Sequence, residues 1–364
     1  MAKEKKKRTA KEMLSFIFRR QIWIPIIALI ALGIFNFIKD PAFFEITLGH
    51  NAAGFPVLSG YLITILDFGS ELAILAMGMT LVTAASGGQD ISVGAGIAVA
   101  GSVILRVLCG PTARAEELQA PVIVAFLVGC VAAMLVGAFN GVLVAFFKIP
   151  PMVATLIMFT AGRSIAAWVN NNVLPVVYDP SFKIFGEFIP GIPIPTPVFI
   201  MLGCCIIMGL LLRFTTLGLY TQAVGINESS AKLNGLNPKL VKFMTFVILG
   251  VCVAIVGLIK VSRISTINYS VVAKDIEMDA ILAVALGGNA LSGGKFNMTA
   301  SILGAYVIQA LTTTLYKMQV SSDALPAYKA VVVIILVVFS APTVRNGISH
   351  MFAKLTKKQA KEVA

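Results

Sequence analysis

Ionisable side chains in or beside long apolar stretches are the residues of this sequence best placed to do chemistry. They are Asp67, Glu71, Asp90, Arg106, Arg163 and Lys260. Burying such groups costs free energy, so each should face a cavity, pair with an opposite charge or reach water. Asp67 and Glu71 stand four residues apart, and ionised carboxylates at that helical spacing repel each other. We expect this pair near the outer membrane surface rather than in a proton relay, and Arg163 in a structural ion pair.

Residue combinations typical of enzymes and metal sites are missing from the apolar stretches. The sequence has no HExxH motif and no Ser, His and Asp set, and His50 and His350 both lie outside those stretches. The five cysteines have no CxxC spacing and sit among apolar residues, which favours packing over metal binding. A weak likeness to a phosphate-binding loop at 291–296 fails because Phe296 stands where Ser or Thr must reach magnesium. We expect no catalytic residue, no metal and no cofactor.

Two glycine-containing segments, 87–94 and 287–294, interrupt otherwise apolar sequence. They match at an offset of 200 residues with four of eight positions identical, which indicates an internal duplication. Broken helices at corresponding places in two halves of a membrane protein surround solute paths in transporters. Tight turns at the cytoplasmic ends of helices explain the glycines equally well, and the sequence leaves both interpretations open. The candidate residues are Gly87, Gly88, Asp90, Ser92, Gly287, Gly288, Asn289 and Ser292.

The amino-acid composition indicates that this chain is a membrane protein. Of the 364 residues 58% are hydrophobic and 13% are charged, which excludes an ordinary water-soluble globule. Helices are expected because each one satisfies its own backbone hydrogen bonds in lipid. We therefore predict an all-α, polytopic fold of about ten transmembrane helices. Apolar runs of near-spanning length lie at about 22–38, 61–85, 91–108, 121–147, 151–169, 196–212, 243–261, 278–291, 299–316 and 328–341.

The distribution of basic residues predicts the orientation and the domain limits. Residues 1–20 hold eight basic and two acidic side chains, 213–242 hold four and one, and 345–364 hold five and one. Because positive residues stay on the cytoplasmic side, these three segments are expected there. We predict basic cytoplasmic tails at 1–21 and 344–364 around a transmembrane domain at 22–343. The basic N-terminus is interpreted as a topology signal that also attracts anionic lipid, not as a site for nucleic acid.

The cytoplasmic segment 213–242 is the most structured of the predicted loops. Asn227 as N-cap and Gly235 just past the end predict a short helix at 228–233. Small residues around an exposed turn let another protein approach closely, so we expect a rigid knob that a partner binds. The candidate contact residues are Gln222, Ala223, Gly225, Asn227, Ala231 and Gly235.

Several separated motifs, in order between about residues 60 and 342, carry a family resemblance. Residues 87–94 resemble the motif Gly-Gly-Ile-Asp-Leu-Ser-Val-Gly, with Gln89 in place of the usual Ile, and 147–156 and 278–288 are also similar to family segments. The chain resembles the membrane permease of bacterial sugar-importing ABC transporters of the ribose type. Residues 153–163 and 293–297 look closest to the galactofuranose-type branch.

The resemblance implies a mechanism and partners. Two permease subunits would form the path through the bacterial inner membrane, and an extracytoplasmic binding protein would deliver a monosaccharide. A separate ATPase would dock on the loop from Ala223 to Gly235, and the permease itself would hydrolyse nothing. Gln222 stands where the family usually has Glu, which puts one charged contact to the ATPase in question. A galactofuranose-like chain would pair with a different permease, and a ribose-like chain with itself.

Two other classes of protein are compatible with the residues alone. An ion-coupled secondary transporter is allowed by Asp67, Glu71 and the glycine segments, and a membrane scaffold or enzyme subunit is disfavoured by the missing catalytic clusters. Polar residues such as Asn140, Thr155, Asn170 and Gln309 could line a path or tie helices together.

Overall fold

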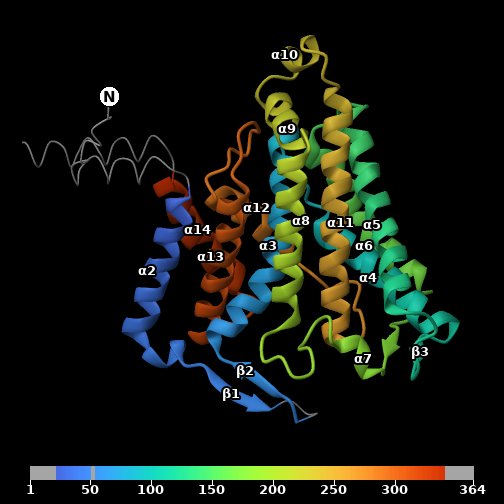
Figure 1. Cartoon of the computed structure of the whole chain (residues 1–364), viewed down its shortest axis with the longest axis vertical. Coiled ribbons are helices and arrows are strands. Elements are labelled where there is room, and N and C mark those ends of the chain that lie inside the picture. Colours follow the sequence, from blue (N-terminus) through green and yellow to red (C-terminus); the bar gives the residue numbers. More distant parts are fainter. Residues whose placement is uncertain (1–21, 51–53, 341–364) are drawn as a thin grey trace, which may run out of the picture.

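The computed structural model describes residues 22–50 and 54–340, and helices make up most of this part of the chain (Figure 1). The prediction of an all-α fold is confirmed, and the basic tails expected at 1–21 and 344–364 lie outside the described residues. Ten helices in the described ranges have 11 or more residues: α2 (Trp23–Lys39), α3 (Tyr61–Ser86), α4 (Val93–Cys109), α5 (Val122–Ala145), α6 (Pro151–Val169), α8 (Thr196–Phe214), α11 (Pro238–Ile264), α12 (Ile276–Leu286), α13 (Met298–Lys317) and α14 (Leu325–Ser340).

Six of these helices are long and apolar enough to cross a membrane: α3, α5, α6, α8, α11 and α13. The helices α2 and α4 are apolar but have 17 residues each, and α12 and α14 have 11 and 16. The expected count of ten crossings therefore includes four shorter helices. The helix expected at 278–291 ends early, at Leu286, because Gly287 and Gly288 follow and Gly288 has a left-handed φ of +74°.

The short elements gather at the two ends of the helix bundle (Figure 1). At one end lie the short helices α9 (Leu217–Ile226) and α10 (Glu228–Leu233). The other end carries the antiparallel hairpin of β1 (Thr47–His50) and β2 (Pro56–Ser59), and α7 (Pro180–Lys183). The remaining short elements are η1 (Pro41–Phe44), η2 (Gly110–Thr112) and the parallel pair β3 (Arg114–Ala115) and β4 (Val176–Val177).

Helix α11 is the centre of the bundle, because it packs against α3, α4 and α5. Glycines bring α5 and α11 close together. A Cβ atom on Gly250 of α11 would stand 2.7 Å from the carbonyl oxygen of Ala133, and one on Gly137 of α5 would meet the carbonyl oxygen of Phe246. Lipid provides no hydrophobic force between helices, so such close backbone contact supplies the packing energy.

Arg163 of α6 holds an irregular segment rather than an ion pair. Its Nη1 donates to the carbonyl oxygens of Tyr269 at 2.8 Å and Val272 at 2.9 Å. No ion pair of Arg163 within 4.0 Å occurs in the described part of the chain, although its charge attracts that of the buried Glu277 on α12. The segment between α11 and α12 is made of turns rather than a continuous helix, and the guanidinium supplies donors to two of its carbonyl groups.

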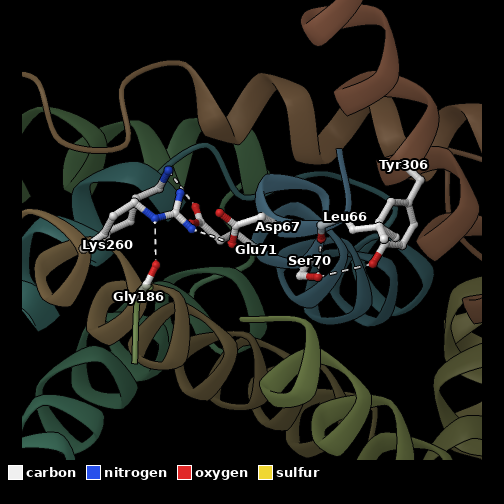
Figure 2. Close-up of polar contacts among 8 residues, drawn as sticks. Leu66, Asp67, Ser70, Glu71, Gly186, Lys260 and Tyr306 are labelled. Atoms are coloured by element: carbon white, nitrogen blue, oxygen red, sulfur yellow. Dashed lines mark hydrogen bonds and ion pairs between the residues drawn. The ribbon is translucent and has the colours of Figure 1, made fainter. Parts of the chain in front are cut away.

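A buried ion-pair cluster joins α3 to α11 (Figure 2). Arg263 Nη2 lies 2.8 Å from Asp67 Oδ1 and 2.9 Å from Glu71 Oε1, and Lys260 Nζ lies 2.6 Å from Glu71 Oε2. Two cations thus neutralise the repulsion expected between the carboxylates. The guanidinium of Arg263 also stands 4.0 Å from the ring centre of Phe68 and donates to Gly186, which ties down the segment after α7.

A second contact joins helix ends on the side of the β1–β2 hairpin. Lys317 Nζ at the end of α13 lies 2.6 Å from Asp40 Oδ2, just after α2, and 4.6 Å from the ring centre of Tyr61 at the start of α3. The hydrogen bond from Lys317 lowers the pKa of the Asp40 carboxyl group. The ends of three helices therefore meet at one lysine.

We predict that Arg263→Met lowers the free energy of unfolding by about 3–5 kcal/mol, because it removes the cation that pairs with the partly buried Asp67 and the buried Glu71. The midpoint of thermal unfolding of the purified protein measures this loss. The double variant Arg263→Met with Asp67→Asn should regain part of it, since the unpaired charge is then absent. A single variant that unfolds at the wild-type temperature would contradict the anchoring role.

Candidate functional site

The two glycine segments lie side by side in the structure. Gln89 Nε2 donates to the carbonyl oxygen of Leu291 at 3.1 Å, and the amide of Gly294 donates to Ala84 at 2.9 Å. Gly87 ends α3 in a left-handed conformation, with φ of +66°, and lies against the backbone of Ser292. The sequence singled out both segments, but only the fold could bring residues 200 positions apart into contact.

Asp90 is the centre of a buried polar group in the first segment. Its Oδ1 accepts from the amide and hydroxyl groups of Ser92, at 2.7 and 2.6 Å. Asn140 of α5 donates to Ser92 Oγ at 2.8 Å and to Asp90 Oδ2 at 3.4 Å. Ser92 is the N-cap residue of α4 but makes no side-chain cap bond. The carboxylate is therefore held by hydrogen bonds, and no ion pair of Asp90 is found in the described residues.

The first segment connects α3 to α4, and these two helices pack against largely different helices. Helix α4 packs mainly against α5, α6 and α11, whereas α3 packs against α8, α11 and α13. Ile91 donates its amide to Thr155 Oγ1 of α6 at 3.1 Å, and a Cβ on Gly88 would stand 2.8 Å from Pro151. The segment is thus in contact with the start of α6.

The second segment is a turn between two packed helices, α12 and α13. Asn289 organises this turn, because its Oδ1 accepts from the amide of Asn297 at 2.6 Å and its Nδ2 donates to Ser301 Oγ at 2.7 Å. Thr80 of α3 donates to the same Ser301 at 2.7 Å. Gly287 lies against the backbone of α13, and Ser292 is exposed. The two segments therefore share a glycine pattern but have different surroundings.

Most of the polar residues named from the sequence tie helices together. Asn140 and Thr155 bond to the first glycine segment, and Asn170 Nδ2 donates to Ser102 Oγ of α4 at 2.6 Å. Gln309 makes a long contact, 3.5 Å, to Thr313 of its own helix. Three of the four are thus occupied in contacts between helices or with the segments that connect them.

The predicted helix at 228–233 is confirmed as α10. Asn227 Oδ1 accepts from the amide of Ser230 at 2.9 Å, which is the expected N-cap bond, and Gly235 follows the helix with φ of +79°. Helix α9 precedes it and was not predicted, because its apolar residues continue the run of α8 without a clear stop. Only Thr215 and Thr216 separate the two helices.

Ala231 faces inward, which corrects the expectation that its small side chain meets a partner. It is 5% exposed and packs with Val224 of α9 and Val241 of α11. Gln222 and Ala223 are partly buried on α9, and the exposed surface of α10 is instead marked by Leu233, which is 89% exposed. A single leucine among the mostly polar residues of 227–234 was the signal that the sequence analysis missed.

Gly225 connects the knob formed by α9 and α10 to the end of α3 and to the second glycine segment. A Cβ atom there would collide with the carbonyl oxygen of Ala84 and would stand 2.6 Å from the amide of Gly294. These two groups share the hydrogen bond that joins the end of α3 to the second segment. Displacement of α9 therefore acts directly on the contact between the end of α3 and the second segment.

We predict that Gly225→Ala lowers stability by about 3 kcal/mol, because the added methyl group overpacks this contact. Gly235→Ala is the control: it has open space and loses only about 1 kcal/mol for its left-handed backbone. Thermal unfolding of both purified variants gives the comparison. Equal losses would contradict the assignment of Gly225 as the contact point.

Comparisons with known proteins agree with this architecture. Residues 61–341 match the family model described as "Branched-chain amino acid transport system / permease component". The fructose import permease protein of Bifidobacterium longum is 34% identical, over 99% of each chain. The galactofuranose transporter permease protein of Escherichia coli is 34% identical over 86% of this chain and 87% of its own length.

A ribose import permease protein of Escherichia coli is also 34% identical, over 76% of this chain and 84% of that relative. No solved structure matches the chain. The family match covers every described helix from α3 to α14, including both glycine segments and the knob. The chain belongs to the family of the branched-chain amino acid transport system permease components, and it is a multi-pass membrane transport subunit.

Proposed function

We propose that this chain is the membrane subunit of an ATP-driven importer that carries a monosaccharide into the cytoplasm. The relatives named for fructose, galactofuranose and ribose support a sugar, and their equal identity assigns no single one of them to this chain. The observation that carries the proposal is the contact of Gly225 with Ala84 and Gly294, which links an exposed knob to the end of α3 and to the second glycine segment.

The knob is stiff enough to act as a lever for a separate ATPase. Asn227 caps α10, and Ala231 of α10 packs against α9 and α11. Glu228 also joins α10 to α11 through its ion pair with Lys242 at 2.6 Å. Packed helices move as units, so a force on α10 is transmitted through α9 to the end of α3 and to the second glycine segment. The glycine segments, whose backbones are non-helical, are where such a movement would open or close a path.

The two ends and the sides of the bundle offer surfaces for the other proposed partners, the binding protein and a second permease subunit. The start of α2 and the end of α14 lie on the same side as α10 (Figure 1), which supports cytoplasmic termini beside the ATPase. The hairpin end would then receive an extracytoplasmic binding protein. Helices α5, α6 and α8 are mostly unburied, with apolar side chains available to lipid or to a second permease subunit.

The ion-coupled alternative loses its main residues. Asp67 and Glu71 are both paired with cations, so neither is a free proton carrier in this structure. The relatives are also permeases of sugar import systems by name.

We predict that proteoliposomes holding this chain and its ATPase take up radiolabelled monosaccharide only with ATP, and that vanadate abolishes uptake. A proton uncoupler should leave the rate unchanged. Gly235→Pro should separate ATP hydrolysis from uptake, because proline cannot adopt the φ of +79° that ends α10. Uptake by the permease alone, or at wild-type rates in Gly235→Pro, would refute the proposed lever.

A second prediction concerns the docking surface. Leu233→Ser should weaken binding of the ATPase about tenfold, because a side chain 89% exposed alone becomes buried in the complex. Its thermal unfolding should match the wild type. Leu174→Ser, an exposed leucine in the loop after α6, is the control and should bind the ATPase normally. Equal binding by the two variants would place the ATPase elsewhere.

A further inference from the structure

A cavity of about 900 Å³ lies between α10 and the turn that joins α5 to α6. Its walls come from three elements: the turn at Lys148, the inner side of α10 at Lys232, and the first turn of α11 at Lys239 and Lys242. Ser86 and Pro151 reach its inner end, beside the first glycine segment. This space is separate from the exposed leucine surface of the knob.

The cavity has a strong positive charge. Four lysines and a single acidic residue, Glu228, line it, and Glu228 is already paired with Lys242 at 2.6 Å. Lys148 and Lys232 are exposed, and neither makes an ion pair with any other residue in the described ranges. A hollow lined by charges of one sign concentrates ions of the opposite sign, so its ligand should be an anion.

The apolar surface beside the cavity identifies the kind of anion. Phe147 is 70% exposed, and Phe146 and Leu240 are about half exposed, directly next to Lys148 and Lys239. Lys239 Nζ stands 5.7 Å from the ring centre of Phe146, at the point where the apolar helix α5 ends. A soluble anion needs only the lysines. A phospholipid needs basic groups with an apolar surface beside them, at the end of a membrane helix.

We propose that this cavity binds the phosphodiester headgroup of an anionic phospholipid from the leaflet on the α10 side. Lys148 and Lys232 contact the phosphate, and the acyl chains lie along Phe146 and Phe147. A headgroup held by both lysines bridges α10 and the α5–α6 turn, the same turn that touches Gly88 through Pro151. The lipid thus steadies the knob relative to the first glycine segment. The proposal does not rest on which solute is carried.

Native mass spectrometry of the full chain tests this proposal, with phosphatidylglycerol and phosphatidylcholine of identical acyl chains as the probes. The wild type should bind phosphatidylglycerol at least about tenfold more tightly. The double variant Lys148→Gln with Lys232→Gln should weaken that binding about 25-fold, at about fivefold for each lysine near a membrane surface. Binding of phosphatidylcholine should not change.

A matched control removes the same charge elsewhere. Lys183→Gln with Lys295→Gln changes two exposed lysines that do not line the cavity, and it should keep the wild-type preference. The variant Lys148→Arg with Lys232→Arg retains both charges and should also keep it. Equal loss in the Lys183 and Lys295 variant, or loss in the arginine variant with normal thermal unfolding, would overturn the proposal.

The wild type alone also decides the question if the glutamine variant fails to fold. Equal affinity for the two lipids would refute a headgroup site. Displacement of phosphatidylglycerol by inorganic phosphate at equal concentration would assign the cavity to soluble anions, and displacement by the ATPase subunit would assign it to that protein. Retention of the lipid against both competitors is the result expected.

Discussion

Inside a bilayer a polar group has no water to bond, and this constraint explains the polar contacts found between the helices. Where the backbone is helical it satisfies itself. Where it is not, a side chain from another helix supplies the missing partner, as Arg163 does for the segment before α12 and Thr155 does for Ile91. The irregular segments are therefore the parts of the bundle with the most specific connections to their neighbours.

Charges obey the same constraint in two different ways. Asp67 and Glu71 are matched by Arg263 and Lys260, which makes a neutral group that anchors α3 to α11. Asp90 has hydrogen bonds to Ser92 and Asn140 instead. The paired cluster joins two regular helices, whereas the Asp90 group shapes a connection between helices. The ion-pair anchor thus lies within α3, and the hydrogen-bonded Asp90 group lies just after its end.

Signals between residues close in the sequence predicted individual helices, but they could not predict contacts between residues far apart in the sequence. Asn227 and Gly235 specified α10 because capping depends on residues a few positions apart. The inward direction of Ala231 depends on Val241, and the partners of Arg163 lie more than 100 residues away. The meeting of the two glycine segments is of the same kind: their likeness is visible in the sequence, but their contact depends on how α3 and α12 are placed.

Gly225 is the residue through which the knob contacts both α3 and the second glycine segment. Two hydrogen-bonded groups, the carbonyl of Ala84 and the amide of Gly294, leave no room for a side chain at that point of α9. The knob is thus in backbone contact with the membrane domain where the ends of α3 and the second segment meet. Backbone contact cannot yield by a change of rotamer, so motion of α9 must shift the helices themselves. A glycine that looks permissive in the sequence is, in the fold, a point of direct backbone contact between the knob and the bundle.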